Sequence, residues 1–250
     1  MKLLMIGHML GDFYFQTNVM AEKKKKSFGY TALHSAIYGM VMFVALAIMT
    51  GKIVENILPS LLISVMHLLV DAVKCGVNKW GKLKKYELEV FFVDQLIHMG
   101  LLVVVDCLFT VQFNIYWISC ISENILNSMQ NAPVVILAFL ICGKPAAIIV
   151  SLVFGLIPKT TGITEINNES IVGIKKESVR IGSWIGILER EIILILGLLG
   201  QYGAIGFVIA AKSLARHSQL NDPVFAEKYL IGTLLSSFMA LLCVMMCKVL

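Results

Sequence analysis

The feature that most constrains this chain is a series of long apolar runs, several of which reach the roughly 20 residues that a helix needs to cross a bilayer. Hydrophobic residues make up 58% of the 250 residues and charged residues only 15%, which excludes an ordinary soluble domain. We therefore expect an all-α, polytopic integral membrane helical bundle. Its eight or so transmembrane segments are predicted at 2–20, 30–50, 57–75, 89–111, 133–157, 180–199, 201–218 and 224–247.

The positions of the basic residues predict how these segments are oriented, because Lys and Arg collect in cytoplasmic loops. Sixteen Lys and Arg residues fall in the loops of one side, and only Lys2, Lys52 and Lys248 fall on the other. We therefore expect a multi-pass protein with both termini outside. The same distribution explains the net charge of +5, so no nucleic-acid partner is expected.

The chain divides where residues 112–132 contain no Lys or Arg and repeat isoleucine at helical spacing. Such a pattern predicts an amphipathic helix that lies at the outer membrane interface. On this basis residues 1–111 form a four-helix membrane domain. Residues 133–250 form a second membrane domain, with a cytoplasmic linker at 158–180.

The predicted segment 133–157 has two interpretations, because Gly143, Lys144 and Pro145 stand at its middle. It is either one kinked crossing or two half-helices that form a re-entrant hairpin. A hairpin would move the later basic loops to the outside, against their charge. We therefore expect the kinked crossing.

The strongest chemical signal is the repeated spacing of His and Asp by four residues. Five His and five Asp placed at random would give about 0.2 such pairs, and the first domain has three. Residues four apart lie on one helix face, so each pair can present a nitrogen and an oxygen ligand to one point. With one further imidazole, the His/Asp set consists of His8, Asp12, His34, His67, Asp71, Asp94 and His98.

The depth of these residues in the predicted helices indicates a shared site. Asp12, His34, His67 and Asp94 each lie about 10–17 Å below the cytoplasmic surface, at a rise of 1.5 Å per residue. Four imidazoles with carboxylates favour a divalent transition metal, with Zn expected and Mn, Fe or Ni as alternatives. Seven potential ligands are more than the four that a tetrahedral metal ion needs. The site could therefore hold two metal ions, or one metal ion whose ligands are oriented by the remaining side chains.

Two other interpretations of the His/Asp set remain open. The side chains could form hydrogen bonds across the bundle, or they could relay protons or ions through a transporter. An intramembrane carboxylate costs about 2.5–3.5 kcal/mol, whereas such hydrogen bonds return about 0.6 kcal/mol. Metal binding is therefore the favoured interpretation.

The sequence around the His/Asp set also resembles a known family. The relevant stretches are residues 7–17 (GHMLGDFYFQT), 33–34 (LH), 67–71 (HLLVD) and 93–98 (VDQLIH). In order and spacing they are similar to the bacterial membrane family known as domain of unknown function 3307. The resemblance covers about residues 3–110, and the second half resembles the C-terminal region of longer members. It implies a location in the bacterial inner membrane but no activity.

A more distant likeness links the chain to inner-membrane proteins described as metal-dependent hydrolases, which also carry His and Asp on short membrane helices. From this likeness, together with the depth of the His/Asp set and the basic residues nearer the cytoplasmic surface, we expect a hydrolase that acts near the cytoplasmic leaflet on a lipid-linked or phosphorylated substrate. The metal would activate a water molecule. Asp12 or Asp71, whichever is not a ligand, would be the general base.

Four basic residues could hold the anionic headgroup of a membrane lipid or another anionic substrate: Lys74, Arg190, Lys212 and Arg216. Alternatively, the last two are cations that extend to the cytoplasmic headgroups and only set topology. Two other functions remain open for the whole chain: a metal-ion or proton transporter that uses the same His/Asp set, and a non-catalytic scaffold. The sequence is compatible with a homo-oligomer.

Overall fold

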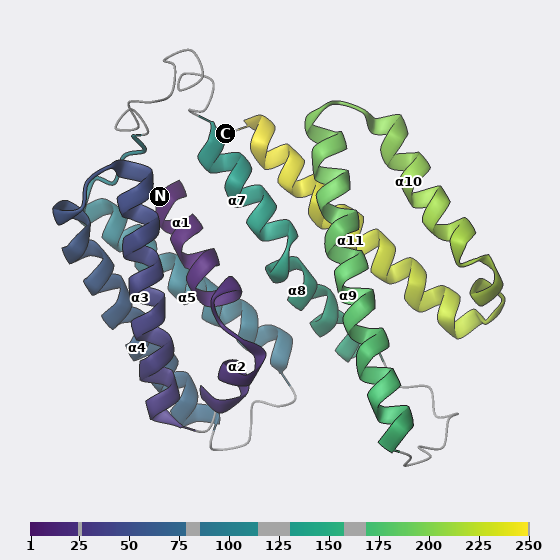
Figure 1. The fold of residues 1–250 in the computed structure, drawn as a ribbon, viewed down its shortest axis with the longest axis horizontal. Helices are drawn as coiled ribbons and strands as arrows, with labels where there is room; N and C mark the ends of the chain where they lie inside the picture. Colours follow the sequence, from purple (N-terminus) through teal and green to yellow (C-terminus); the bar gives the residue numbers. More distant parts are fainter. Residues whose placement is uncertain (25–26, 79–85, 115–130, 158–168, 250) are drawn as a thin grey trace. The chain divides into compact units, whose positions relative to one another are not determined.

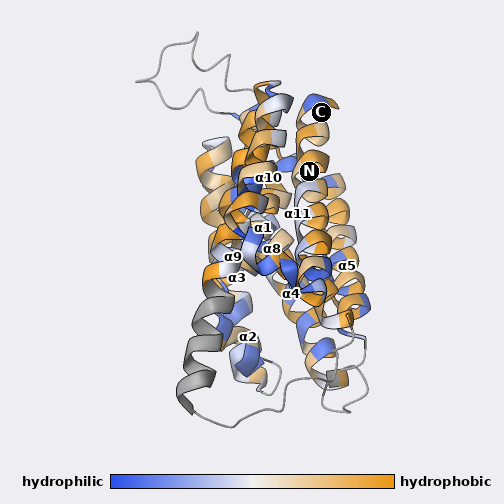
Figure 2. Ribbon diagram, turned by 90° about the vertical axis from the view of Figure 1, so that its right-hand side faces the viewer, coloured by the Kyte–Doolittle hydropathy of each residue, from blue (hydrophilic) through white to orange (hydrophobic). Residues whose placement is uncertain are grey.

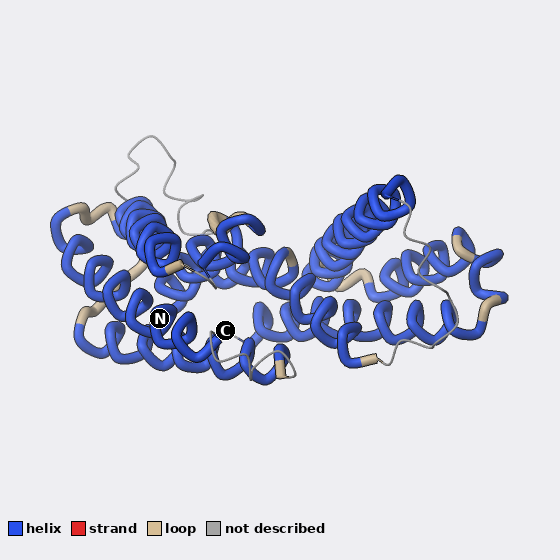
Figure 3. Tube along the Cα trace, turned by 90° about the horizontal axis from the view of Figure 1, so that it is seen from below, coloured by secondary structure: helices blue, strands red, loops and turns tan. Residues whose placement is uncertain are grey.

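A computed structural model describes residues 1–24, 27–78, 86–114, 131–157 and 169–249, with the backbone alone at 78 and 169–180. Within these ranges the chain is all helical, and Figure 3 shows helices and connecting loops without a strand. The chain divides into two compact units, Met1–Leu140 and Ile141–Leu250. The amphipathic helix expected at 112–132 lies almost entirely outside the described residues.

The first unit starts with a broken helix that packs against two of three long helices (Figure 1). The broken part consists of α1 (Lys2–Met9), the π-helical turn η1 (Leu10–Tyr14) and the short helix α2 (Asn18–Lys24). The long helices are α3 (Phe28–Thr50), α4 (Ile57–Asn78, preceded by the 3₁₀ turn η2, Val54–Asn56) and α5 (Glu87–Leu108). Helix α1 packs on α3 and α5, and α4 packs on the same two helices. The unit also contains most of α7 (Ala132–Cys142).

Glycines bring the helices of this unit unusually close together. A Cβ atom added to Gly11 would lie 2.6 Å from Cδ2 of Tyr38, and one added to Gly39 would lie 2.5 Å from Oγ of Ser64. Small residues at such positions allow membrane helices to pack backbone against backbone. The start of the chain is thereby held against α3, and α3 against α4.

An apolar cluster fills the unit on the side where Met1, Thr50 and Leu108 lie. Its buried members are Leu3, Leu4, Tyr38, Met42, Leu46, Ile63, Leu102 and Val105. On α3, α4 and α5 they begin one turn beyond His34, His67 and His98, respectively. The cluster therefore closes one end of the His/Asp layer.

The second unit contains α8 (Lys144–Leu156), α9 (Glu169–Leu198), α10 (Tyr202–Ala215), the 3₁₀ turn η4 (His217–Asn221) and α11 (Pro223–Val249). Helix α11 packs along α9 and α8, and α10 packs on α9. The expected kink is a break at Gly143, whose ψ of −115° is not helical. The linker expected at 158–180 is helical from Glu169 onward.

Five helical stretches in the described residues are long and apolar enough to cross a membrane: Phe28–Thr50, Val54–Val77, Glu87–Leu108, Ala132–Leu156 and Pro223–Val249. Figure 2 shows hydrophobic residues along most of the coloured part of the helices. These features support a membrane protein, but eight crossings are not confirmed.

Two of the eight expected crossings, 2–20 and 201–218, are not among these five stretches. The first is interrupted after Tyr14, and the second contains the 14-residue helix α10. Fourteen residues of helix extend only about 21 Å, which is shorter than the apolar thickness of a bilayer. The segment expected at 180–199 forms the second part of α9, which is not among the five.

Candidate metal centre

The structure brings the His/Asp set together inside the first unit, from η1 and the four helices α1, α3, α4 and α5. All four imidazoles are at most 3% exposed, and the three carboxylates are at most 8% exposed. Buried charged groups are stable only when they are paired or bind a metal. The contacts of these side chains therefore decide what the site can bind.

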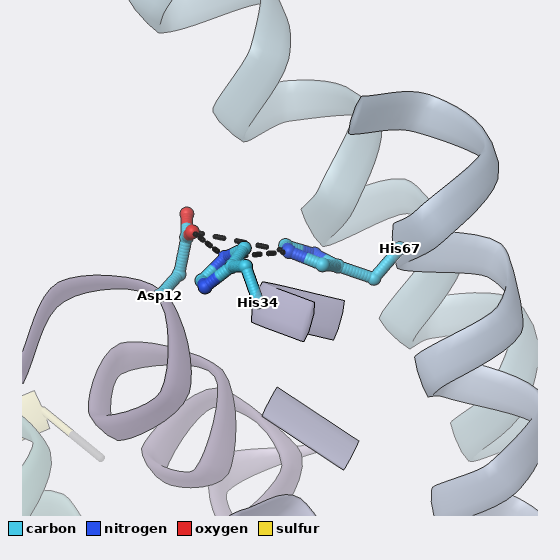
Figure 4. Close-up of side chains that lie close together, drawn as sticks. All are labelled: Asp12, His34 and His67. Carbon is cyan, nitrogen blue, oxygen red and sulfur yellow. Dashed lines mark hydrogen bonds and ion pairs between the residues drawn. The ribbon is translucent and has the colours of Figure 1, made fainter. Parts of the chain in front are cut away.

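At the centre, two imidazoles face each other between two carboxylates. Nε2 of His34 lies 3.1 Å from Nε2 of His67 and 3.2 Å from Oδ1 of Asp12, as Figure 4 shows. Oδ1 of Asp12 is 3.9 Å from Nε2 of His67. Oδ2 of Asp71 is 3.4 Å from Nε2 of His67 and 3.8 Å from Nε2 of His34.

These distances match the spacing of ligands around a zinc ion. Four atoms placed tetrahedrally at about 2.0–2.1 Å from zinc lie about 3.3 Å from one another. Of the six pairs formed by the donor atoms of Asp12, His34, His67 and Asp71, the five other than Asp12–Asp71 are 3.1 to 3.9 Å apart. By geometry, Asp12, His34 and His67 could hold a metal ion.

His98 provides a further nitrogen beside this centre. Its Nδ1–H donates to the backbone oxygen of Asp94 at 2.8 Å, so that Nε2 carries a lone pair. Nε2 is buried and has no hydrogen-bond partner among the described residues. His98 also belongs to a second possible ligand group, with His67 and Asp71. An unpaired, buried nitrogen in this position fits a metal ligand.

His8 lies outside both ligand groups and instead supports them. Its Nε2–H donates to Oε1 of Gln95 at 3.2 Å, and its Nδ1 forms a hydrogen bond with the hydroxyl of Tyr38 at 3.0 Å. Nε2 of Gln95 donates to Oδ2 of Asp12 at 3.2 Å, so the amide links His8 to a central carboxylate. Partners of this kind orient metal ligands.

Asp12 lies in a π-helical turn that directly follows the helix that carries His8. In η1 the N–H of Phe15 donates to the oxygen of Leu10, five residues back, at 2.9 Å. Asp12 meets His34 and His8 meets Tyr38, which lies one turn further along α3, so His8 and Asp12 contact successive turns of the same helix. Such turns are frequent at functional sites.

Two lysines neutralise the carboxylates. Nζ of Lys24, at the end of α2, lies 3.0 Å from Oδ2 of Asp71 and 3.9 Å from Oδ1 of Asp12. Nζ of Lys74 lies 2.6 Å from Oδ2 of Asp94, which is in neither ligand group. Lys74 was expected to bind substrate, and the structure shows it in this ion pair.

Three residues of the site were not predicted from the sequence: Tyr38, Gln95 and Lys24. The ring of Tyr38 stacks on that of His67, with centroids 3.9 Å apart and planes 5° apart. Tyr38 follows His34 by four residues, so the spacing rule applied to His and Asp would have found it. Lys24 stands in a run of four lysines that look alike in the sequence.

The comparison with known families decides where the chain belongs. A family described as "Protein of unknown function (DUF3307)" matches residues 1–127, slightly more than half of the 250 residues. The chain belongs to this family. No curated protein and no solved structure shows significant similarity to it. The DUF3307 match includes the whole His/Asp set, and the family description names no activity.

The part of the DUF3307 chain beyond the match holds the other predicted substrate cations. Arg190 is 2% exposed and binds the end of α7: its Nε donates to the oxygen of Cys142 at 2.6 Å, and its Nη2 to that of Gly143 at 3.2 Å. A third bond, 3.1 Å long, joins Nη1 to Oγ of Ser236. The oxygen of Gly143 also accepts from the N–H of Ala147 at 3.2 Å, so Arg190 adds a second bond to it at the helix break.

Lys212 also has partners within the second unit. Its Nζ lies 2.5 Å from Oε2 of Glu189 and 3.2 Å from Oγ1 of Thr233. Arg216 is the residue at which α10 ends. A role for Arg190, Lys212 and Arg216 in substrate binding stays a prediction. For Arg190, the contacts within the protein already explain why a cation is buried there.

Proposed function

We propose that this DUF3307 protein is an integral-membrane, metal-dependent hydrolase. It acts near the cytoplasmic leaflet of the bacterial inner membrane, on a lipid-linked or phosphorylated substrate. The observation that carries the proposal is the buried group of Asp12, His34 and His67, whose donor atoms lie 3.1–3.9 Å apart, with a second carboxylate, Asp71, 3.4 Å from Nε2 of His67.

The residues of the centre fit distinct roles. Asp12, His34 and His67 would hold zinc, or Mn, Fe or Ni in its place. Three protein ligands leave a fourth position for water or substrate, as in catalytic zinc sites. A metal ion there supplies a Lewis acid and an activated water. Asp71, with Oδ2 3.4 Å from Nε2 of His67, would accept the proton of that water.

The apolar cluster supports a site rather than a transport path. A path across the membrane needs polar groups, or water, on both sides of the His/Asp layer. On the side of Met1 and Thr50, the layer is followed by buried Leu4, Met42 and Leu102, each at most 1% exposed. On the other side lie Lys24 and Lys74, whose side chains are 14% and 27% exposed. Access from one side suits an enzyme.

Asp71→Asn tests hydrolysis directly. The amide cannot accept a proton, so we expect metal-dependent turnover to fall about 100-fold, the range of general base catalysis. The purified protein is incubated with lipid extracts and zinc, and products are identified by mass spectrometry. Glu55→Gln, an exposed change outside the site, should leave turnover intact.

A different outcome would favour transport. If no lipid changes, but liposomes that contain the protein pass zinc or protons down a gradient, the His/Asp set is a path and the hydrolase proposal is wrong. Loss of this flux in the Asp71→Asn variant would assign the path to the same residues.

The leaflet assignment is tested by labelling single cysteines in a cysteine-free variant. Glu22→Cys on α2 and Lys52→Cys after α3 are both at exposed positions. From the distribution of Lys and Arg, we expect a membrane-impermeant maleimide to reach position 52 from outside intact cells, and position 22 only after lysis. The opposite pattern would move the centre to the outer leaflet.

A further inference from the structure

Lys24 occupies a position that matters for any ion bound at the centre. Its ammonium contacts the two carboxylates that flank the paired imidazoles, Asp71 at 3.0 Å and Asp12 at 3.9 Å. The side chain is 14% exposed, more than those of Asp12 and Asp71. Lys24 therefore supplies a positive charge to the same oxygens that a metal would use.

A metal ion and this ammonium compete for the carboxylates. A divalent ion held by Asp12, His34 and His67 would lie only a few ångströms from Nζ of Lys24. Repulsion between like charges at such distances is strong in a poorly solvated site. The ion also replaces the ammonium as the charge that neutralises Asp12 and Asp71. Binding of the metal should therefore release Lys24.

The helix that carries Lys24 is suited to such a movement. Helix α2 has seven residues, none of them buried, and packs on α3. Segments with few buried contacts open at low free-energy cost. By contrast, Lys74 lies on the long helix α4 and pairs with Asp94, which is outside both ligand groups. A metal would leave the pair of Lys74 in place.

We propose that Lys24 is the anion-recognition residue of this centre: the metal displaces its ammonium from Asp71 and Asp12, and the ammonium then pairs with a phosphate group of the substrate. The inference rests on the proposed function and adds the substrate's chemistry. Lysine is a frequent phosphate ligand that acts as a point charge. Beside a metal ion, it would give a phosphate oxygen two positive partners.

The first test is the zinc affinity of Lys24→Met. Removal of the competing charge should tighten zinc binding at least about tenfold. The control is Lys23→Met, which removes an equal charge from the neighbouring residue, whose Nζ instead contacts the hydroxyl of Tyr30 at 3.1 Å. Its zinc affinity should match that of the wild type. If Lys24→Met binds zinc equally or more weakly, the inference is wrong; if the wild type binds no zinc, the proposed function fails too.

The second test uses the unaltered protein in phosphatidylcholine nanodiscs, with an amine-reactive label and mass spectrometry of peptides. Zinc should raise labelling of Lys24 several-fold and leave Lys23 unchanged. Either inorganic phosphate or phosphatidic acid in the disc should then protect Lys24 again, and the effective one identifies a free or a lipid-borne phosphate. No rise with zinc overturns the displacement, and no protection by either phosphate overturns the anion role.

Discussion

Replacement of His67 by alanine is expected to empty the metal centre. His67 is common to both possible ligand groups, and its Nε2 is within 3.9 Å of donor atoms of Asp12, His34 and Asp71. Mutation of residues that only orient the ligands lowers metal affinity about 10–100-fold. Loss of the ligand His67 itself should therefore lower the affinity by more than about 100-fold. Zinc should fall from about one ion per chain to background.

Elemental analysis of detergent-purified protein, loaded with zinc and freed of excess, measures this loss. His217→Ala is the matched control, because His217 is exposed in η4 of the second unit. Thermal unfolding must show that the His67→Ala protein is still folded. A folded variant that keeps its zinc would remove the basis of the proposed hydrolase.

Replacement of Arg190 by methionine is expected to destabilise the second unit severely. The side chain donates to three buried partners, the carbonyls of Cys142 and Gly143 and the hydroxyl of Ser236. The oxygen of Gly143 keeps its bond from the N–H of Ala147, so the variant leaves the oxygen of Cys142 and the hydroxyl of Ser236 without the bond from Arg190. Each buried group left without a partner costs about 1–3 kcal/mol, so we expect a loss of about 2 kcal/mol or more.

Thermal unfolding in detergent, followed by size-exclusion chromatography, measures the effect. Arg216→Met, at the end of α10, is the control and should change stability little. Arg190→Lys keeps the charge but lacks the planar guanidinium group, so its single ammonium cannot bond to all three acceptors. This variant should recover only part of the stability. If Arg190→Met is fully stable yet uses substrate poorly, Arg190 binds substrate as the sequence pattern indicated.

The candidate site shows where local reasoning is sufficient. His67 and Asp71 lie in the continuous helix α4, and their side chains approach to 3.4 Å as spacing by four predicts. His8 and Asp12 have the same spacing, but they hydrogen-bond with Tyr38 and His34 on successive turns of α3, and Asp12 lies in the π-helical turn η1. The π-helical turn has no distinct sequence signal here.

The number of membrane crossings shows a second limit. Hydropathy measures whether a stretch can be in lipid, and it correctly indicated a helical membrane protein. It does not measure whether the helix is continuous. The stretch 2–20 is apolar but breaks after Tyr14, and its first part packs on α3 and α5 rather than forming a long helix.

The sequence by itself determined the membrane class, the family and the chemical character of the site, because composition and spacing along a helix are local properties. Only the tertiary structure decided which donors meet. Asp12, His34 and His67 are separated by 22 and 33 residues, and Lys24 reaches Asp71 across 47. Contacts over such separations depend on how closely the helices pack, which here follows from Gly11 of η1 and Gly39 of α3.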